Sequence, residues 1–183
     1  SMACGMALEG FIPYVNTIAT FLTRRCFEQI SLDMGLQKTK IRLIANGGGL
    51  VYAPLGPTHL ATDDISILRT IPNMTILVPA DALEMVKLMK ETIDYPGPIY
   101  IRVAKGGDPI VTKGLYNKFK IGKLFKIGKE EDTIIITTGI SLNIAINVKR
   151  ILNSEGKKVG IIHVPTVKPI DQKNLLKLLV NSS

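Results

Sequence analysis

His59 is the residue whose type and setting best suit chemistry. It lies in a glycine-rich stretch, residues 49–64, that follows the aliphatic and β-branched run of residues 40–46. That run is bounded by three glycines and predicts a strand. Open α/β sheets bind ligands beyond the carboxyl ends of their parallel strands, and an imidazole at that edge can transfer a proton near neutral pH. From this local pattern alone, a solvent-exposed turn histidine is the alternative.

Strands and helices alternate around this stretch. Residues 2–9 are typical of the last turns of a helix that ends at Gly10, so we expect the chain to begin within an element. The alternation predicts an α/β fold, with a parallel sheet, right-handed crossovers and helices on both faces. Apolar runs predict strands over residues 11–15, 40–46, 75–79 and 98–104, and Asp81 is expected to cap a helix over residues 82–93.

The longest predicted helix follows the first of these strands. Asn16 or Thr17 can cap it, and it would run to about Met34, before Gly35. Apolar residues recur along it at helical spacing. The spacing by itself predicts a core face for each of them, Phe21 included.

Part of a second, smaller α/β domain is expected after residue 131. Residues 133–139 predict a buried strand, and Ser141 can cap the helix that follows. Residues 159–164 predict another strand, in which His163 is interpreted as a satisfied core or interface histidine. We therefore expect incomplete domains at residues 1–104 and 132–183, joined by a linker at residues 105–131.

Composition limits the possible functions. With 183 residues, 46% of them hydrophobic, the chain can bury one good core or two small ones. Its net charge of +8 invites a nucleic-acid interpretation, but six lysines fall between residues 113 and 129, in a stretch typical of a solvated linker or edge strand. We expect no nucleic-acid partner.

Two isolated cysteines, with no signal peptide and no long apolar segment, predict a cytoplasmic protein without a zinc-type metal site or membrane partner.

The motif around His59 resembles the pyrimidine-binding domain of the transketolase family, which depends on thiamine diphosphate. The similarity lies in the motif Gly56-Pro57-Thr58-His59 and in the predicted helix that follows it. The sequence of residues 17–30 is also similar to a helix of the family. Residues 164–171 are similar, more generically, to the family's carboxy-terminal domain. The resemblance implies the parallel α/β fold and, as the activity, transfer of a two-carbon ketol unit between sugar phosphates.

The resemblance also implies roles for three residues. In the family, the histidine faces the reactive thiazolium carbon and hydrogen-bonds the sugar, which makes His59 the catalytic candidate. Phe21 matches the aromatic residue that stacks on the cofactor pyrimidine, where offset stacking adds about 0.5–1.5 kcal/mol beyond burial. Lys105 stands where the family has an arginine that grips the sugar phosphate, and a lysine gives a looser contact. A core role for Phe21 and a solubilising role for Lys105 are the alternatives.

The resemblance implies that other parts of the site lie elsewhere. The family's cofactor-activating glutamate would precede Ser1, and a separate domain holds the diphosphate and Mg²⁺, so no metal ligand is expected in this chain. The isolated chain is therefore expected to be inactive. Cofactor sites in the family lie between subunits, so a homodimer or a diphosphate-binding partner subunit is expected.

Two departures from the family pattern bear on the substrate. Many relatives have an acidic residue where this chain has Leu55, and a polar or histidine side chain within the segment that here reads Asn46-Gly47-Gly48-Gly49. Loss of a buried acceptor weakens sugar discrimination by about 1–3 kcal/mol. A standard pentose-phosphate substrate is therefore in doubt, and an altered ketose donor remains open.

Two other functions remain open. A deoxyxylulose-phosphate synthase or a 2-oxoacid dehydrogenase β subunit uses a similar pyrimidine domain, with pyruvate or another 2-oxoacid as donor. A non-catalytic paralogue would keep the fold as a binding or assembly module, an alternative that Leu55 and Lys105 make conceivable.

Overall fold

The computed structural model describes residues 1–128 and 132–180. It forms two compact units, one of residues 1–77 and 89–108, the other of residues 78–88 and 109–183. The last part of the predicted linker, residues 129–131, and the end of the predicted second domain, residues 181–183, lie outside the described residues.

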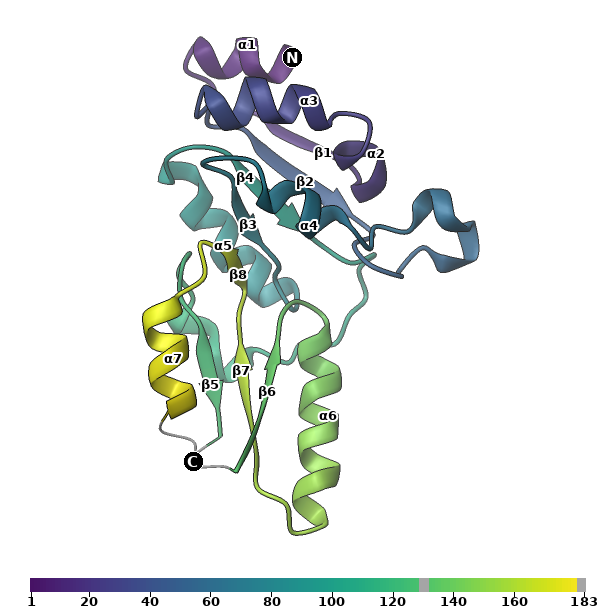
Figure 1. Cartoon of the computed structure of the whole chain (residues 1–183), viewed down its shortest axis with the longest axis vertical. Helices are drawn as coiled ribbons and strands as arrows, with labels where there is room; N and C mark the ends of the chain where they lie inside the picture. Colours follow the sequence, from purple (N-terminus) through teal and green to yellow (C-terminus); the bar gives the residue numbers. More distant parts are fainter. Residues whose placement is uncertain (129–131, 181–183) are drawn as a thin grey trace. The chain divides into compact units, whose positions relative to one another are not determined.

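The first unit is built on a parallel sheet (Figure 1). β1 pairs with β2, β2 with β4 and β4 with β3, each pair in parallel. The inner strands are aliphatic and buried on both sides, as expected for a parallel sheet covered by helices. The predicted α/β fold class is confirmed. The strands are β1 (Tyr14–Ile18), β2 (Arg42–Asn46), β3 (Thr75–Leu77) and β4 (Ile99–Arg102).

The single long helix predicted from residue 16 or 17 to about Met34 is wrong. The first strand extends to Ile18, because Val15 to Ile18 pair in register with β2 as far as Asn46. β-branched Thr17 and Ile18 suit that extended backbone. The helical stretch then breaks at residues 24–26 and ends in a π-helix. Its segments, with the other helices of this unit, are α1 (Met2–Leu8), α2 (Ala19–Thr23), α3 (Phe27–Gln29), the π-helix η1 (Ile30–Leu36) and α4 (Asp64–Arg69).

The second unit contains a three-stranded mixed sheet in the order β5-β7-β6. β7 is the central strand, and all five of its residues are buried. β6, predicted to be a buried strand, is instead partly exposed, and within the described residues it pairs only with β7. The elements are β5 (Phe125–Ile127), β6 (Thr133–Thr137), β7 (Val159–His163), β8 (Thr166–Lys168), α6 (Ser141–Ser154), α7 (Gln172–Val180) and the 3₁₀ helix η4 (Lys113–Lys118).

The helix predicted over residues 82–93 is confirmed as α5 (Ala82–Asp94). Asp81 caps it as expected, since its Oδ1 accepts the backbone N–H of Glu84 at 3.0 Å. In the part of the chain that the structure describes, no helix is both long and apolar enough to cross a membrane.

Candidate functional site

His59 lies on a loop that leaves the carboxyl end of β2 and projects from the edge of the sheet (Figure 1). Two short 3₁₀ turns, η2 (Ala53–Leu55) and η3 (Pro57–His59), build the loop. Gly56 separates them with φ +81°, a backbone conformation that strains any residue with a side chain, so the glycine is needed at this junction. Pro57 then starts the turn that carries the histidine.

The imidazole of His59 is half-buried, and one of its two nitrogens is held by a neighbour. Its Nδ1 lies 3.0 Å from the hydroxyl oxygen of Thr58. The Nε2 atom has no hydrogen-bond partner among the described residues. The Thr58 contact therefore orients the ring and leaves Nε2 to meet a ligand.

The structure brings Phe21 and His59 together. Their ring centroids are 5.0 Å apart with an interplanar angle of 68°, an edge-to-face arrangement. Phe21 is half-buried on α2, and the guanidinium carbon of Arg25 lies over its ring, 4.5 Å from the centroid. Two residues 38 positions apart in the sequence thus form one polar and aromatic patch at the carboxyl edge of the sheet.

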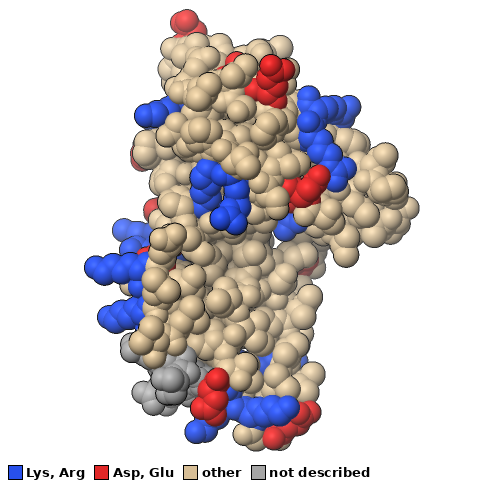
Figure 2. Space-filling model, in the orientation of Figure 1, with Lys and Arg blue, Asp and Glu red and all other residues tan. Residues whose placement is uncertain are grey.

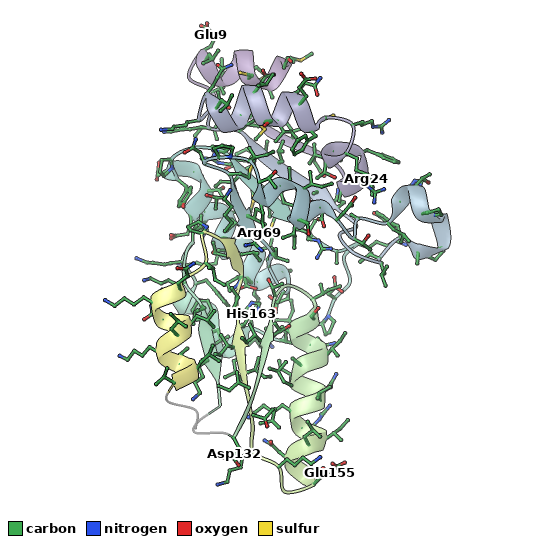
Figure 3. All side chains as sticks on the ribbon, viewed as in Figure 1. Glu9, Arg24, Arg69, Asp132, Glu155 and His163 are labelled. Carbon is green, nitrogen blue, oxygen red and sulfur yellow. The ribbon has the colours of Figure 1, made fainter. Side chains whose placement is uncertain are left out.

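Arg24 joins α2 to the histidine loop, and Figure 3 labels it at the end of that helix. Its Nε and Nη2 donate to both carboxylate oxygens of Asp63 at 2.9–3.2 Å, and Nη2 also donates to the carbonyl of Leu60 at 2.8 Å. The hydrogen bonds lower the pKa of Asp63 and raise the pKa of Arg24. We refer to Arg24, Leu60 and Asp63 as the Arg24 clamp.

A buried network supports the base of the loop. The carboxylate of Asp64 is 1% exposed and accepts the hydroxyl of Tyr100 at 2.7 Å, and Arg102 Nε lies 2.9 Å from the same oxygen. Arg102 Nη2 donates to the carbonyl of Ala61 at 3.0 Å. Burial, followed by the charge of Asp64, raises the pKa of Tyr100 far above its usual value. Arg102 therefore supports the structure at the base of the loop.

Packing explains why residues 47–49 are glycines. A Cβ at Gly48 would lie 2.4 Å from Arg102 Nε, and a Cβ at Gly47 would lie 2.1 Å from the ring of Tyr52. The side chains of Arg102 and Tyr52 thus fill the space beside the backbone of this segment. The departure from the family pattern at Asn46–Gly49 is therefore accompanied by two large side chains packed against it.

Lys105 is not joined to the other two candidates. It is exposed after the end of β4, and within the described residues it has no hydrogen-bond or ion-pair partner. Gly106 and Gly107, both with positive φ, continue the turn. The phosphate-binding role of Lys105 stays a prediction, as do the catalytic role of His59 and the cofactor-binding role of Phe21.

The side chains of Phe21 and His59 suit the ring system of thiamine diphosphate. A half-exposed phenyl ring offers a surface to a flat pyrimidine, and an imidazole with a free nitrogen stands beside it. Within the described residues, no group of three His, Cys, Asp or Glu could hold a metal ion. The chemistry of the Phe21 and His59 side chains therefore fits the ring system of the cofactor.

Sequence reasoning missed one buried polar group outside this patch, the guanidinium of Arg42. Arg42, fully buried in β2, donates to the carbonyls of Thr92, Tyr95 and Gly97 at 2.5–2.9 Å. Burial lowers the pKa of its guanidinium. An arginine within an apolar strand was the available signal. In the second unit, His163 is fully buried, which confirms its predicted core position. Its Nε2 is paired with Glu84, whereas its Nδ1 has no hydrogen-bond partner among the described residues.

A parallel α/β unit with an imidazole and an aromatic ring at the carboxyl edge of its sheet is typical of a ligand-binding domain. Residues 1–107 match the transketolase pyrimidine-binding domain, and residues 122–182 match the transketolase C-terminal domain. The chain therefore belongs to the transketolase family, whose members depend on thiamine diphosphate, and the resemblance noted in the sequence is confirmed.

Three curated relatives illustrate the range of the family. A putative uncharacterized transketolase family protein of Sinorhizobium fredii is 34% identical over 174 residues, 95% of this chain and 50% of the relative. One of the subunits of the apulose-4-phosphate transketolase of Phocaeicola vulgatus is 31% identical over 96% of this chain and 56% of the relative. A 1-deoxy-D-xylulose-5-phosphate synthase of Dictyoglomus turgidum is 37% identical over 99% of this chain and 29% of the relative.

Solved structures share the fold. A split-gene transketolase, described as an inactive β4 tetramer, superposes with a TM-score of 0.89 at 28% identity, covering 99% of this chain and 58% of that one. A transketolase of Pichia stipitis superposes with a TM-score of 0.83 at 22% identity, covering 92% of this chain and 25% of that one. The chain thus spans between about a quarter and just over half of the length of these relatives.

Proposed function

We propose that this chain supplies the pyrimidine-binding part of a thiamine diphosphate-dependent transferase that moves a two-carbon ketol unit between sugar phosphates. The observation that supports this most is the contact between Phe21 and His59 at the carboxyl edge of a parallel sheet, in a chain of the transketolase family. The proposal gives each ring a separate task.

Phe21 would hold the aminopyrimidine of the cofactor by stacking. One face of its ring is covered by the guanidinium of Arg25, so a stacked pyrimidine takes either the other face or the place of Arg25. When bound, thiamine diphosphate supplies a nucleophilic carbon that accepts the two-carbon unit. Phe21 contributes binding and orientation to that chemistry.

His59 would meet the sugar. With Nδ1 oriented by Thr58, its Nε2 can exchange a hydrogen bond or a proton with a substrate hydroxyl. Lys105 would hold the phosphate as a point charge, because a lysine lacks the bidentate fork of arginine. We assign Mg²⁺ and the diphosphate to a separate diphosphate-binding domain, contributed by a partner subunit or, in a homodimer, by the second copy of a longer protein. We place the enzyme in the cytoplasm and in carbohydrate metabolism.

The donor substrate separates this proposal from its nearest alternative. One relative is named a 1-deoxy-D-xylulose-5-phosphate synthase, and another is named as part of an apulose-4-phosphate transketolase. Consumption of a ketose phosphate supports the transketolase-type reaction. Consumption of pyruvate, or of another 2-oxoacid, supports a synthase or a dehydrogenase β-type subunit.

The first experiment is a calorimetric titration of thiamine diphosphate with Mg²⁺ into this chain mixed with its diphosphate-binding partner. Saturable binding supports the proposal, and Phe21→Leu is expected to weaken it because the stacking surface is lost. His59→Ala should keep cofactor binding and lose transfer. No binding with both folded proteins present contradicts the proposal and favours a non-catalytic binding module.

A further inference from the structure

We propose that Arg24 is a positioning residue, which holds His59 against Phe21 by binding the chain on the carboxyl side of the histidine turn. The geometric part of this inference is independent of any ligand. Its consequence for the reaction rests on the proposed function.

The Arg24 clamp connects the two segments that carry the rings. Arg24 follows Thr23, the last residue of α2, and so lies one helical turn beyond Phe21. It donates to Leu60, the residue after His59, and to both carboxylate oxygens of Asp63. A guanidinium bound in this bidentate way fixes both distance and angle. The clamp therefore sets how far the histidine turn stands from the helix of Phe21.

The other supports of the loop act at its base and not at the ring pair. The backbone of Gly49 exchanges two hydrogen bonds with that of Ala61, at 2.8 and 3.1 Å, and Arg102 donates to Ala61. The two backbone bonds close the base of the loop, and the bond from Arg102 ties the loop to β4. Among the described residues, the hydrogen bonds between α2 with its cap and the loop all come from Arg24.

The loop has a place at which it can move if the clamp is lost. Gly56, with φ +81°, stands at the start of the turn that ends at His59. Glycine has the least hindered backbone of any residue. Without Arg24, no hydrogen bond among the described residues joins the turn to α2, and rotation at Gly56 is expected to separate the two rings.

The two rings give a direct measurement in solution. The chain has only two histidines, His59 and His163, so the imidazole C2 protons give two resonances. A proton beside an aromatic ring is shifted by the ring current, and the shift decreases steeply with distance. Phe21→Leu removes the ring and thus defines the full ring-current shift of His59. The second resonance belongs to His163, which is buried in β7 and serves as the internal reference.

The test variant is Arg24→Gln in the complete chain. We expect the His59 resonance to move most of the way to its position in Phe21→Leu, and the His163 resonance to stay. Asp63→Asn should give a similar but smaller movement, because Leu60 remains bound. Adding Asp63→Asn to Arg24→Gln should add little, as for two residues that act as a unit. Arg24→Lys, which keeps the charge, should restore part of the shift.

The matched control is Arg150→Gln, at another exposed arginine that donates to a side chain, Asn147. It should leave the His59 resonance unchanged. Thermal unfolding midpoints of all variants check the fold, and exposed ion pairs contribute little to stability. An unchanged His59 resonance in folded Arg24→Gln overturns the inference. So does an unchanged resonance in Phe21→Leu, because the ring pair would then be absent in solution.

The loaded enzyme gives a second, separate measurement. Misplacing a substrate-binding group by about 1 Å can cost on the order of a hundredfold in rate, so Arg24→Gln should lower kcat up to that extent while the affinity for thiamine diphosphate with Mg²⁺ is kept. If the rings separate in the NMR experiment and the wild-type chain binds no cofactor, the clamp stands and the proposed function fails. If the rings separate and kcat is unchanged, the positioning role of Arg24 is overturned.

Discussion

The imidazole Nε2 of His163 lies 2.9 Å from Oε2 of Glu84, and both side chains are fully buried in the second unit. The same carboxylate oxygen accepts the backbone N–H of Ala80 at 2.7 Å. Glu84 lies in the first turn of α5 and His163 ends β7, so the pair joins two elements of this unit. The Nε2 of His163 and the carboxylate of Glu84 satisfy each other, and removal of either side chain leaves a buried polar partner.

Glu84→Leu is expected to destabilise the second unit by about 1–3 kcal/mol, because it leaves His163 buried without its hydrogen-bond partner. Urea denaturation measures the free energy of unfolding. Glu91→Leu, on the same helix and partly exposed, is the control and should change that energy by no more than about 0.5 kcal/mol. The double variant Glu84→Leu/His163→Leu should recover part of the loss. Equal effects of Glu84→Leu and the control would refute the expectation.

The hydrogen-bonded carboxylate of Asp81 is expected to make the folded protein less stable in acid. Burial would raise the pKa of its carboxyl, but bonds from the backbone N–H groups of Glu84, Val111 and Thr112 and from the Thr112 hydroxyl outweigh it, and the pKa is lowered. The resulting stability is present above the unfolded pKa of about 3.9 and is lost as pH falls through the folded pKa. Asp81→Asn should be less stable at neutral pH, by about 1–3 kcal/mol, and should lose less stability in acid. Parallel pH profiles of the two proteins would contradict this account.

Tyr100 predicts the opposite pH dependence. Its hydroxyl is buried against Asp64, which raises its pKa, so the folded state keeps the proton that the unfolded chain releases near pH 10. The contribution is complete below that pH and decreases as pH rises. Absorbance titration should show a tyrosine that ionises only on unfolding. Tyr100→Phe should remove that signal and cost about 1–3 kcal/mol, because Asp64 loses a buried donor.

Gly48→Ala tests the packing beneath the histidine loop. The new Cβ would lie 2.4 Å from Nε of Arg102, whose guanidinium is held by Asp64 and Ala61 and has little room to yield. We expect a loss of about 1–3 kcal/mol, as for overpacking of a filled site. Gly5→Ala, where a Cβ meets nothing within 4 Å, is the control and should be neutral or stabilising. Urea denaturation measures the free energy of unfolding, and equal values for Gly48→Ala and Gly5→Ala would contradict the expectation.

The net charge of the chain does not by itself predict a nucleic-acid partner. On the face drawn in Figure 2, Lys and Arg side chains lie in separate groups with acidic side chains among them. This distribution differs from the stripe of basic residues that marks a nucleic-acid-binding surface. The expectation of no nucleic-acid partner stays a prediction.

Local pattern was a good guide where neighbouring residues decide the structure. Continuous apolar runs predicted β2, β3 and β4, and the capping residue Asp81 predicted the start of α5. The strand at residues 11–15 was placed too early, since β1 covers Tyr14–Ile18. Capping residues at Asn16 and Thr17 suggested a helix there, but pairing with β2 kept them extended. The local preference of these residues for a helix start is overridden by hydrogen bonding to a strand that lies about thirty residues further along the chain.

By itself, the sequence determined the α/β class, the family and the three candidate residues, because periodicity and motifs are properties of neighbouring residues. Only the tertiary structure decided that Phe21 meets His59, that Arg24 binds both carboxylate oxygens of Asp63, and that Arg102 fills the space beside Gly48. Each of these contacts joins segments separated by dozens of residues, and the parallel crossovers bring those segments to one edge of the sheet. No spacing along the chain encodes such a contact, since it exists only once the strands have paired and the helices have packed.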